Sequence, residues 1–277
     1  MATTAGKKTV LALHGFSQNA TIFAKRLGAL RRQCGKAVEF VFVDAPIILQ
    51  PADLVESTLA SASESQPAST LDALDATDAI ETEQARAWFR WMPHKSEAVG
   101  LPESIEFLRD VLKSRHFDGV IGFSQGAGMA GFLAALLERP HAYPAFLVDG
   151  QPPHPPFEFC VAVSGFRLPG PIGDVVFSSN YTTPTLHIIG RNDVVVIEER
   201  SRQLVRASEN ARVEEHDGGH FVPSKADWRR FLAAYLQDPG GNVPSPASSL
   251  PTTTPGSSAG NSGTVTPATA DASLNRL

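Results

Sequence analysis

The chain has 277 residues, 42% of them hydrophobic and 19% charged, which is enough apolar material to bury a large core and excludes a wholly disordered protein. Its 24 basic and 29 acidic residues give a formal charge of -5. The chain contains no run of Lys and Arg of the kind that binds along a phosphate backbone, which argues against nucleic acid as a partner. Two cysteines, Cys34 and Cys160, are too few for a disulfide framework, so we expect a reducing, cytoplasmic environment.

The first residues lack the charged and then apolar pattern of a secretory signal, so we expect no secretion. The uncharged run 119–137 is long enough to raise the question of a membrane span. Its middle contains Ser124, Gln125 and Gly126, which divide it into a strand and a short helix. We therefore expect no membrane span.

Short, nearly continuous apolar runs alternate with amphipathic segments along the chain. Runs of this kind are typical of strands that are covered on both faces. The expected strands span residues 10–13, 38–43, 119–123, 160–164, 185–189 and 211–215, and the expected helices span 22–32, 102–115, 127–137, 197–207 and 225–236. This order predicts an α/β protein with a mostly parallel central sheet and helices on both faces.

Two segments depart from this alternation. Pro, Gly, Ser and Thr dominate after Asp238, so we expect a folded domain over residues 1–238 and a disordered tail over 239–277. Lys and Arg are absent between Asp44 and Glu83, where acidic and small residues recur. This stretch predicts a surface insertion at about 47–85, either a solvated loop or a lid over the active site.

Residues 122–126, Gly-Phe-Ser-Gln-Gly, form a G-x-S-x-G sequence between an expected strand and an expected helix. Small residues at Gly122 and Gly126 allow the sharp turn that exposes the Ser124 hydroxyl above a sheet. The alternative is a serine that only caps the helix. The position of the strand and helix favours Ser124 as a nucleophile.

A nucleophilic serine needs a histidine base and an acid that orients the base, which follow it in the chain order Ser, Asp, His in this type of fold. Asp193 follows the expected strand 185–189, and His220 follows the last strand after two glycines. Asp174 is a less favourable candidate for the acid because it precedes its strand. His216 is a less favourable candidate for the base because it lies at a strand end. Five further histidines are weaker candidates: His187 lies inside an expected strand, and the others, His94, His116, His141 and His154, precede the acid or lie in unrelated loops. No metal-binding spacing occurs, so we expect no metal.

The tetrahedral intermediate also needs two N–H donors for its oxyanion. We expect them from Gln125, at the start of a helix, and from Phe16, in the loop after the first strand. Aromatic residues next to these loops are expected to line an apolar acyl pocket. They are Phe16, Trp88, Trp91, Phe123, Phe166 and Phe221.

Five blocks together resemble the FSH-type family of serine hydrolases, the group that includes the ovarian-cancer-associated hydrolase and many fungal esterases. The blocks are Leu-His-Gly-Phe-Ser-Gln-Asn at 13–19, Trp-Phe-Arg-Trp at 88–91, Gly-Phe-Ser-Gln-Gly-Ala at 122–127, Ile-Gly-Arg-Asn-Asp at 189–193 and Gly-Gly-His-Phe-Val-Pro at 218–223. Acyl-protein thioesterases share the third block but differ in the first.

The resemblance implies an α/β-hydrolase fold and an esterase or thioesterase activity without cofactor. It also implies the same roles for Ser124, Asp193 and His220. We therefore expect an enzyme that cleaves carboxylic esters with a hydrophobic acyl part. The alternatives are a thioesterase that releases a carrier-bound acyl or polyketide chain and a non-catalytic binding module. The oligomeric state is left open.

Overall fold

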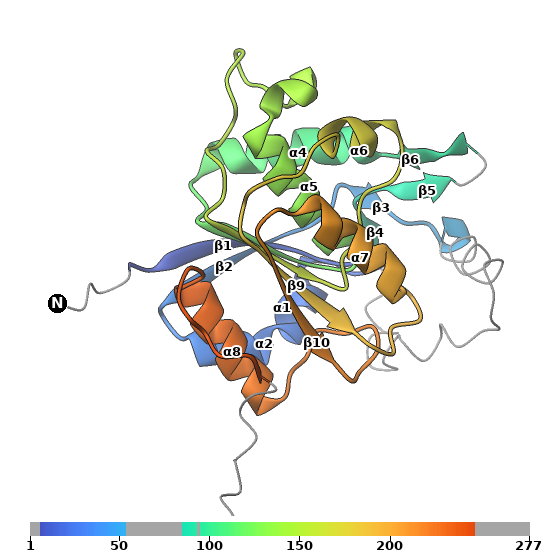
Figure 1. Cartoon of the computed structure of the whole chain (residues 1–277). Coiled ribbons are helices and arrows are strands. Elements are labelled where there is room, and N and C mark those ends of the chain that lie inside the picture. The colour runs from blue at the N-terminus through green and yellow to red at the C-terminus, as the bar shows by residue number, and fades with distance from the viewer. Residues whose placement is uncertain (1–5, 54–84, 93–94, 247–277) are drawn as a thin grey trace, which may run out of the picture.

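The computed structural model describes residues 6–53, 85–92 and 95–246. At its centre is a six-stranded sheet in which every strand is parallel to its neighbours (Figure 1). The strands lie in the order β10 (Ala211–His216), β9 (Thr185–Gly190), β8 (Phe159–Val163), β7 (Gly119–Phe123), β1 (Lys8–Leu13) and β2 (Val38–Val43). All six strands predicted from apolar runs are present, and the parallel α/β architecture is confirmed.

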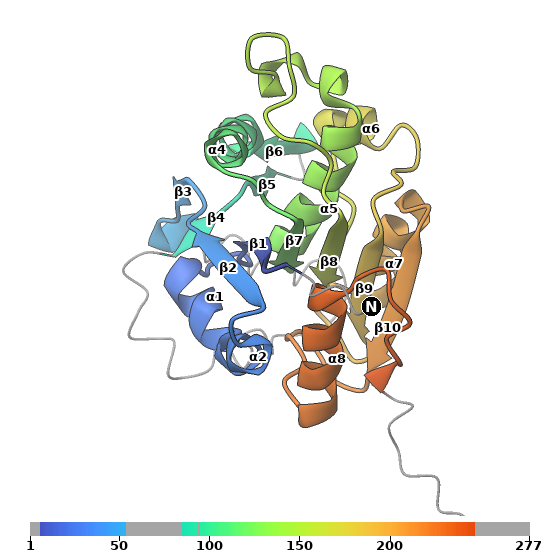
Figure 2. The ribbon, with the colours of Figure 1, turned by 90° about the vertical axis from the view of Figure 1, so that its left-hand side faces the viewer.

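Helices cover both faces of the sheet (Figure 2). One layer consists of α1 (Ala20–Arg26), α2 (Gly28–Cys34) and α8 (Ala226–Gln237), and the other of α4 (Leu101–Ser114), α5 (Gln125–Glu138), α6 (Pro171–Val176) and α7 (Glu198–Ala207). Two short 3-10 helices follow α5, at Pro140–Ala142 and Pro144–Phe146. Alternate residues of β1 enter the two cores: Leu11 and Leu13 pack on the α5 side, and Val10 and Ala12 on the α8 side.

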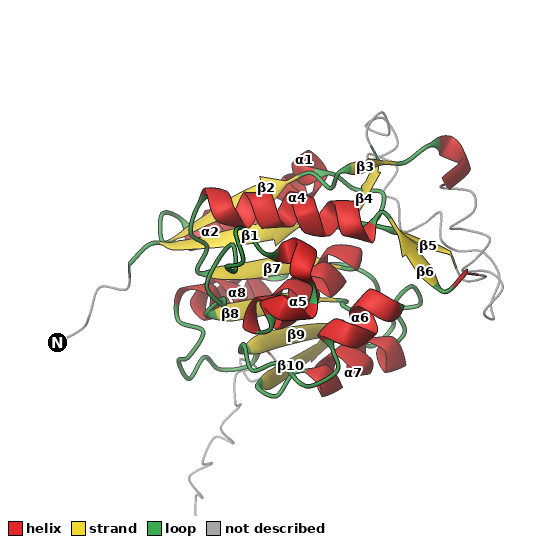
Figure 3. Ribbon diagram, turned by 90° about the horizontal axis from the view of Figure 1, so that it is seen from above, coloured by secondary structure: helices red, strands yellow, loops and turns green. Residues whose placement is uncertain are grey.

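The structure differs from the sequence prediction in its short elements. The single helix expected over 22–32 is two helices, separated at Leu27, where ψ is 3°. Helix α6 and two small antiparallel sheets were not predicted, because they are too short to show a period. One sheet pairs β3 (Ile47–Ile48) with β4 (Arg86–Ala87), and the other pairs β5 (Arg90–Met92) with β6 (Glu97–Val99). Figure 3 shows both small sheets beyond the carboxyl-terminal edge of the central sheet, on the same side as the loops that follow the strands.

Most of the expected insertion at 47–85 lies outside the described residues. Its two ends are adjacent, because Leu49 donates its N–H to the Ala85 carbonyl at 2.8 Å. The described chain also continues beyond Asp238, where the tail was expected to begin. Arg212 donates to the Val243 carbonyl at 2.8 Å, and Val243 packs against the α8 core. The segment 239–246 therefore contacts the domain through Val243, and residues 247–277 lie outside the described chain.

Candidate active site

Ser124 occupies a strained turn between β7 and α5. Its φ is 53° and its ψ is -118°, a region that residues other than glycine rarely adopt. A Cβ at Gly122 would lie 2.1 Å from the Gly126 carbonyl oxygen, and one at Gly126 would lie 2.2 Å from that of Leu13. Both glycines are thus required by backbone packing around the turn, as the motif predicts.

The loops after β9 and β10 bring Asp193 and His220 to this turn. His220 Nε2 lies 2.9 Å from Ser124 Oγ, and His220 Nδ1 lies 2.8 Å from Asp193 Oδ2. Asn192 donates its N–H to the Gly218 carbonyl at 3.0 Å, which ties the two loops together. The structure therefore brings together the three residues that the sequence analysis selected.

The Asp193 carboxylate is held from both sides. Its Oδ1 accepts the N–H groups of Val195 at 2.9 Å and Val196 at 2.8 Å, while Oδ2 faces His220. Burial raises the pKa of Asp193, but the hydrogen bond and charge interaction with His220, together with further hydrogen bonds such as that from the Val196 N–H, outweigh it and hold this pKa below its usual value. An ionised carboxylate can only accept, so His220 donates from Nδ1, and in the neutral form of the ring Nε2 is then the acceptor that faces the Ser124 hydroxyl.

The competing candidates lie elsewhere. Asp174 is on the surface in α6, where it pairs with Arg167 at 2.9 Å. His216 Nδ1 accepts the Gly218 N–H at 3.1 Å, and its ring packs on Trp228. His187 is buried inside β9, and this burial lowers its pKa to about 3. His94 lies outside the described residues.

The loop after β1 approaches Ser124 closely. A Cβ at Gly15 would lie 3.1 Å from the Phe123 ring and 3.4 Å from Ser124 Cβ, so Gly15 lies beside the serine with little room for a side chain. Neither the Phe16 N–H nor the Gln125 N–H has a hydrogen-bond acceptor among the described residues. Both N–H groups are therefore available to an oxyanion, as the sequence analysis expects.

The side chain of Gln125 has a role that the sequence did not reveal. Its Oε1 accepts the Trp88 N–H at 2.8 Å, and its Nε2 donates to the Phe89 carbonyl at 2.7 Å. Trp88 Nε1 in turn donates to the His14 carbonyl at 2.9 Å. Trp88 is 0% exposed, so it belongs to the core beneath the site rather than to the expected pocket wall.

The other expected pocket residues differ in exposure. Phe123 is buried, with its ring 4.8 Å from that of His220, and Phe166 is buried beneath the Arg200 guanidinium. Phe16 is half-buried against the small cluster formed by Leu49, Ala85 and Ala87. Trp91 and Phe221 are 37% and 45% exposed. Of the six aromatics, Trp91 and Phe221 thus present the most open ring surface.

Two exposed apolar residues beside the acid were not predicted from the sequence. Val194 is 75% exposed and Val195 is 39% exposed, directly after Asp193 in the loop that follows β9. The signal was present in the sequence, since three consecutive valines follow the acid in a loop where polar residues are usual.

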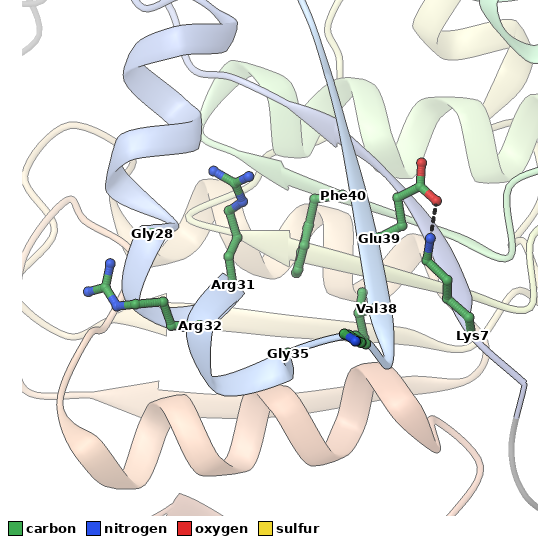
Figure 4. A pocket seen from close by; sticks show the side chains of 9 residues that line it. Lys7, Gly28, Arg31, Arg32, Gly35, Val38, Glu39 and Phe40 are labelled. Carbon is green, nitrogen blue, oxygen red and sulfur yellow. Dashed lines mark hydrogen bonds and ion pairs between the residues drawn. The ribbon is translucent and has the colours of Figure 1, made fainter.

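A basic hollow lies near the amino-terminal end of β2, whereas the serine site lies at the carboxyl ends of the strands (Figure 4). It is lined by Lys7, Gly28, Arg31, Arg32, Gly35, Lys36, Val38, Glu39 and Phe40. The Lys7 ammonium pairs with Glu39 at 2.6 Å. Because Val38 begins β2 and Ser124 follows the end of β7, this hollow is separate from the serine site.

A serine, a histidine and an aspartate in one hydrogen-bonded series, at the carboxyl edge of a parallel sheet, define a serine hydrolase of the α/β-hydrolase class. Within the described chain, no helix is both long and apolar enough to cross a membrane. The same residues contain no group of three or more His, Cys, Asp or Glu side chains that could hold a metal ion.

Comparison with known proteins agrees with this class. A family model described as "Serine hydrolase (FSH1)" matches residues 2–232. Esterase OVCA2 of Danio rerio is 34% identical over 238 residues, which cover 82% of this chain and 96% of the relative. A Schizosaccharomyces pombe protein named dihydrofolate reductase is 34% identical over 233 residues, 82% of this chain, but the chain spans only 46% of that protein's length.

Solved structures share the fold at low identity. Zea mays acyl-protein thioesterase 2 superposes with a TM-score of 0.52 and 22% identity, covering 84% of this chain and 95% of that one. Arabidopsis thaliana SOBER1 superposes with a TM-score of 0.52 and 14% identity, covering 84% and 98%. The chain belongs to the FSH1 family of serine hydrolases, which confirms the family resemblance and the α/β-hydrolase fold expected from the motifs.

Proposed function

We propose that this serine hydrolase cleaves carboxylic esters with a hydrophobic acyl part through an acyl-enzyme on Ser124. The observation that supports this most directly is the hydrogen-bonded series from Ser124 Oγ through His220 to Asp193, with distances of 2.9 and 2.8 Å. The relatives named esterases, among them Esterase CG5412 of Drosophila melanogaster at 30% identity, agree with ester hydrolysis.

In the proposed reaction, Ser124 Oγ attacks the ester carbonyl carbon while His220 Nε2 takes the hydroxyl proton. The imidazolium then gives this proton to the departing alcohol oxygen, and the carbon–oxygen bond of the ester breaks. In the second half, a water molecule gives a proton to His220 and attacks the acyl carbon. The imidazolium returns the proton to Ser124 Oγ as the bond to the serine breaks, and the carboxylic acid is released. Asp193 stays ionised and stabilises the imidazolium in both halves.

The N–H groups of Phe16 and Gln125 are the proposed donors to the oxyanion of each tetrahedral intermediate. Gln125 is the first residue of the 14-residue helix α5, whose positive end adds to the attraction for negative charge. Neither donor has a competing acceptor among the described residues, so no protein hydrogen bond has to break when the oxyanion forms.

The apolar character of the acyl part is inferred from the side chains around the proposed triad. Val194 and Val195 follow the acid, and Phe221 follows the base, and all three are exposed. Apolar surface that is open to water beside a nucleophile favours an acyl chain over a charged substrate. We propose a small-molecule ester as the substrate and a cytoplasmic location, which is compatible with the two free, buried thiols of Cys34 and Cys160.

Labelling with a fluorophosphonate tests the proposed nucleophile. The probe should react with the native chain and not with Ser124→Ala, and Ser124→Ala should lose on the order of a millionfold in kcat, as in another triad enzyme. An unlabelled native chain would favour a non-catalytic binding module. Nitrophenyl esters and acyl thioesters of matched chain lengths then give the ratio of kcat/KM for ester against thioester, and a ratio below one would assign the enzyme to thioesters.

A further inference from the structure

The ring of His14 is fully buried beside the loop that carries Phe16, and both of its nitrogens are engaged. Nδ1 lies 2.8 Å from the Gly15 carbonyl oxygen, and the Ala45 N–H approaches Nε2 at 3.0 Å. Because a backbone N–H can only donate, Nε2 must be unprotonated, and Nδ1 therefore donates its hydrogen to Gly15. Burial lowers the pKa of His14 to about 4, so the ring keeps this neutral form at neutral pH.

The Gly15 carbonyl and the Phe16 N–H belong to the same peptide group. In a planar trans peptide these two groups point in opposite directions, and the described residues contain no cis peptide. Gly15 has no Cβ to restrict rotation of this peptide. The carbonyl is held by two donors, His14 Nδ1–H and the Gln18 N–H at 3.2 Å. Holding the carbonyl on one side fixes the direction of the N–H on the other.

We propose that His14 is a positioning residue, which holds the Gly15–Phe16 peptide so that the Phe16 N–H faces the oxyanion. This inference rests on the proposed function. The same histidine is joined to the second donor, since its carbonyl accepts from Trp88 Nε1 and the Trp88 N–H is bound by the side chain of Gln125. One buried series of side chains thus braces both oxyanion donors, which is the preorganisation that makes such donors effective.

His154 offers a matched control elsewhere in the chain. Its Nε2 accepts the Phe117 N–H at 2.9 Å, and its Nδ1 lies 2.6 Å from the carbonyl of the next residue, Pro155. It is also buried, and burial lowers its pKa. Phe117 precedes β7, at the edge of the sheet opposite to Ser124. His154 therefore repeats the hydrogen-bond pattern of His14 without the neighbouring site.

Two substitutions separate the two hydrogen bonds of the His14 ring. The amide nitrogen of His14→Asn can replace Nδ1 and donate to Gly15, whereas the amide oxygen of His14→Gln can replace Nε2 and accept from Ala45. We expect His14→Gln to lower kcat roughly 10- to 100-fold, up to the loss seen when an oxyanion donor is removed, with little change in KM. His14→Asn should recover most of that loss, and His154→Gln should leave kcat unchanged.

Two further readouts distinguish positioning from a structural role. A trifluoromethyl ketone forms an oxyanion on Ser124, so its affinity should fall in His14→Gln by the same factor as kcat/KM, while the midpoint of the pH–rate profile stays in place. Native kcat and ketone affinity in His14→Gln, or equal losses in the Asn and Gln variants, would overturn the proposal.

If His14→Gln does not fold, ¹⁵N NMR of the native chain decides. We expect the His14 ring to carry hydrogen on Nδ1 and not to titrate between pH 6 and pH 8, roughly two units or more above its lowered pKa. A hydrogen on Nε2 would refute the inference. The proposed function fails separately: turnover in Ser124→Ala would refute it, whereas an inactive Ser124→Ala beside a fully active His14→Gln would refute only the role of His14.

Discussion

Replacing Asp193 with Asn keeps the shape of the side chain and changes its hydrogen-bonding. The two N–H groups of Val195 and Val196 require an acceptor, so the amide oxygen must take the place of Oδ1. The amide NH₂ then faces His220 Nδ1, which must become an acceptor. The ring hydrogen moves to Nε2 and points at the Ser124 hydroxyl, and this tautomer cannot take the serine proton.

The size of the activity loss expected for Asp193→Asn follows from the energy of the alternative orientation of the amide. Turning the oxygen toward His220 restores the active tautomer but leaves the buried Val196 N–H and the partly buried Val195 N–H without an acceptor, at a cost of about 1–3 kcal/mol each. The sum, about 2–6 kcal/mol, corresponds to a loss of about 30-fold to about 25,000-fold in activity, and the upper end agrees in order of magnitude with the ten-thousandfold loss in a serine protease. Initial rates on a nitrophenyl ester measure this loss. Asp174→Asn, on the surface, is the control.

A loss smaller than about tenfold in Asp193→Asn, with unchanged thermal unfolding, would refute this account of the acid. It would mean that His220 holds its active tautomer without the carboxylate. Equal losses in the Asp193 and Asp174 variants would also contradict it, because the Asp174 carboxylate pairs with Arg167 and not with a histidine.

Three further predictions concern the turn, the buried histidines and the end of the domain. Gly126→Ala should prevent a native turn, because its Cβ would lie 2.2 Å from a backbone oxygen, and circular dichroism and labelling would detect this. Burial lowers the pKa of His14 to about 4 and of His187 to about 3, so the unfolded chain binds more protons below pH 6.5. The free energy of unfolding, from urea titrations, should fall as the pH drops from about 6.5 and level off below these values, and a flat profile would contradict the burial. Ending the chain after Asp238 should lower Tm because it removes the carbonyl that Arg212 binds, whereas ending it after Pro246 keeps that contact, and equal Tm values would show that the contact contributes nothing.

The central sheet could be predicted because its strands are buried on both faces. Every residue of β7 and β8 is buried, so their sequences are apolar throughout and stand out without any long-range information. The turn around Ser124 was also predictable, since only glycine fits at 122 and 126. The loops of Asp193 and His220 follow from the order of strands in a parallel sheet, whose carboxyl ends meet at one edge.

The bracing of the site could not be predicted, because its hydrogen bonds join residues far apart in the chain. His14, Trp88 and Gln125 lie on three different segments, and their contacts run from side chain to backbone. No local period encodes such contacts. For the same reason Trp88 was expected to line the pocket: proximity to a motif in sequence does not tell which face of the segment a ring occupies, and the structure buries this one.

The site therefore depends on its residues in two different ways. Gln125 and Phe16 are proposed to act through backbone N–H groups, which any residue except proline supplies. The identity of Gln125 is instead explained by its side chain, which binds the Trp88 N–H and the Phe89 carbonyl. A motif that combines the proposed nucleophilic serine with a glutamine whose side chain hydrogen-bonds to another segment is more specific than the five-residue G-x-S-x-G pattern alone. The glutamine requires a partner segment such as 88–89, so finding both blocks in one chain favours a braced site over a serine that only caps a helix.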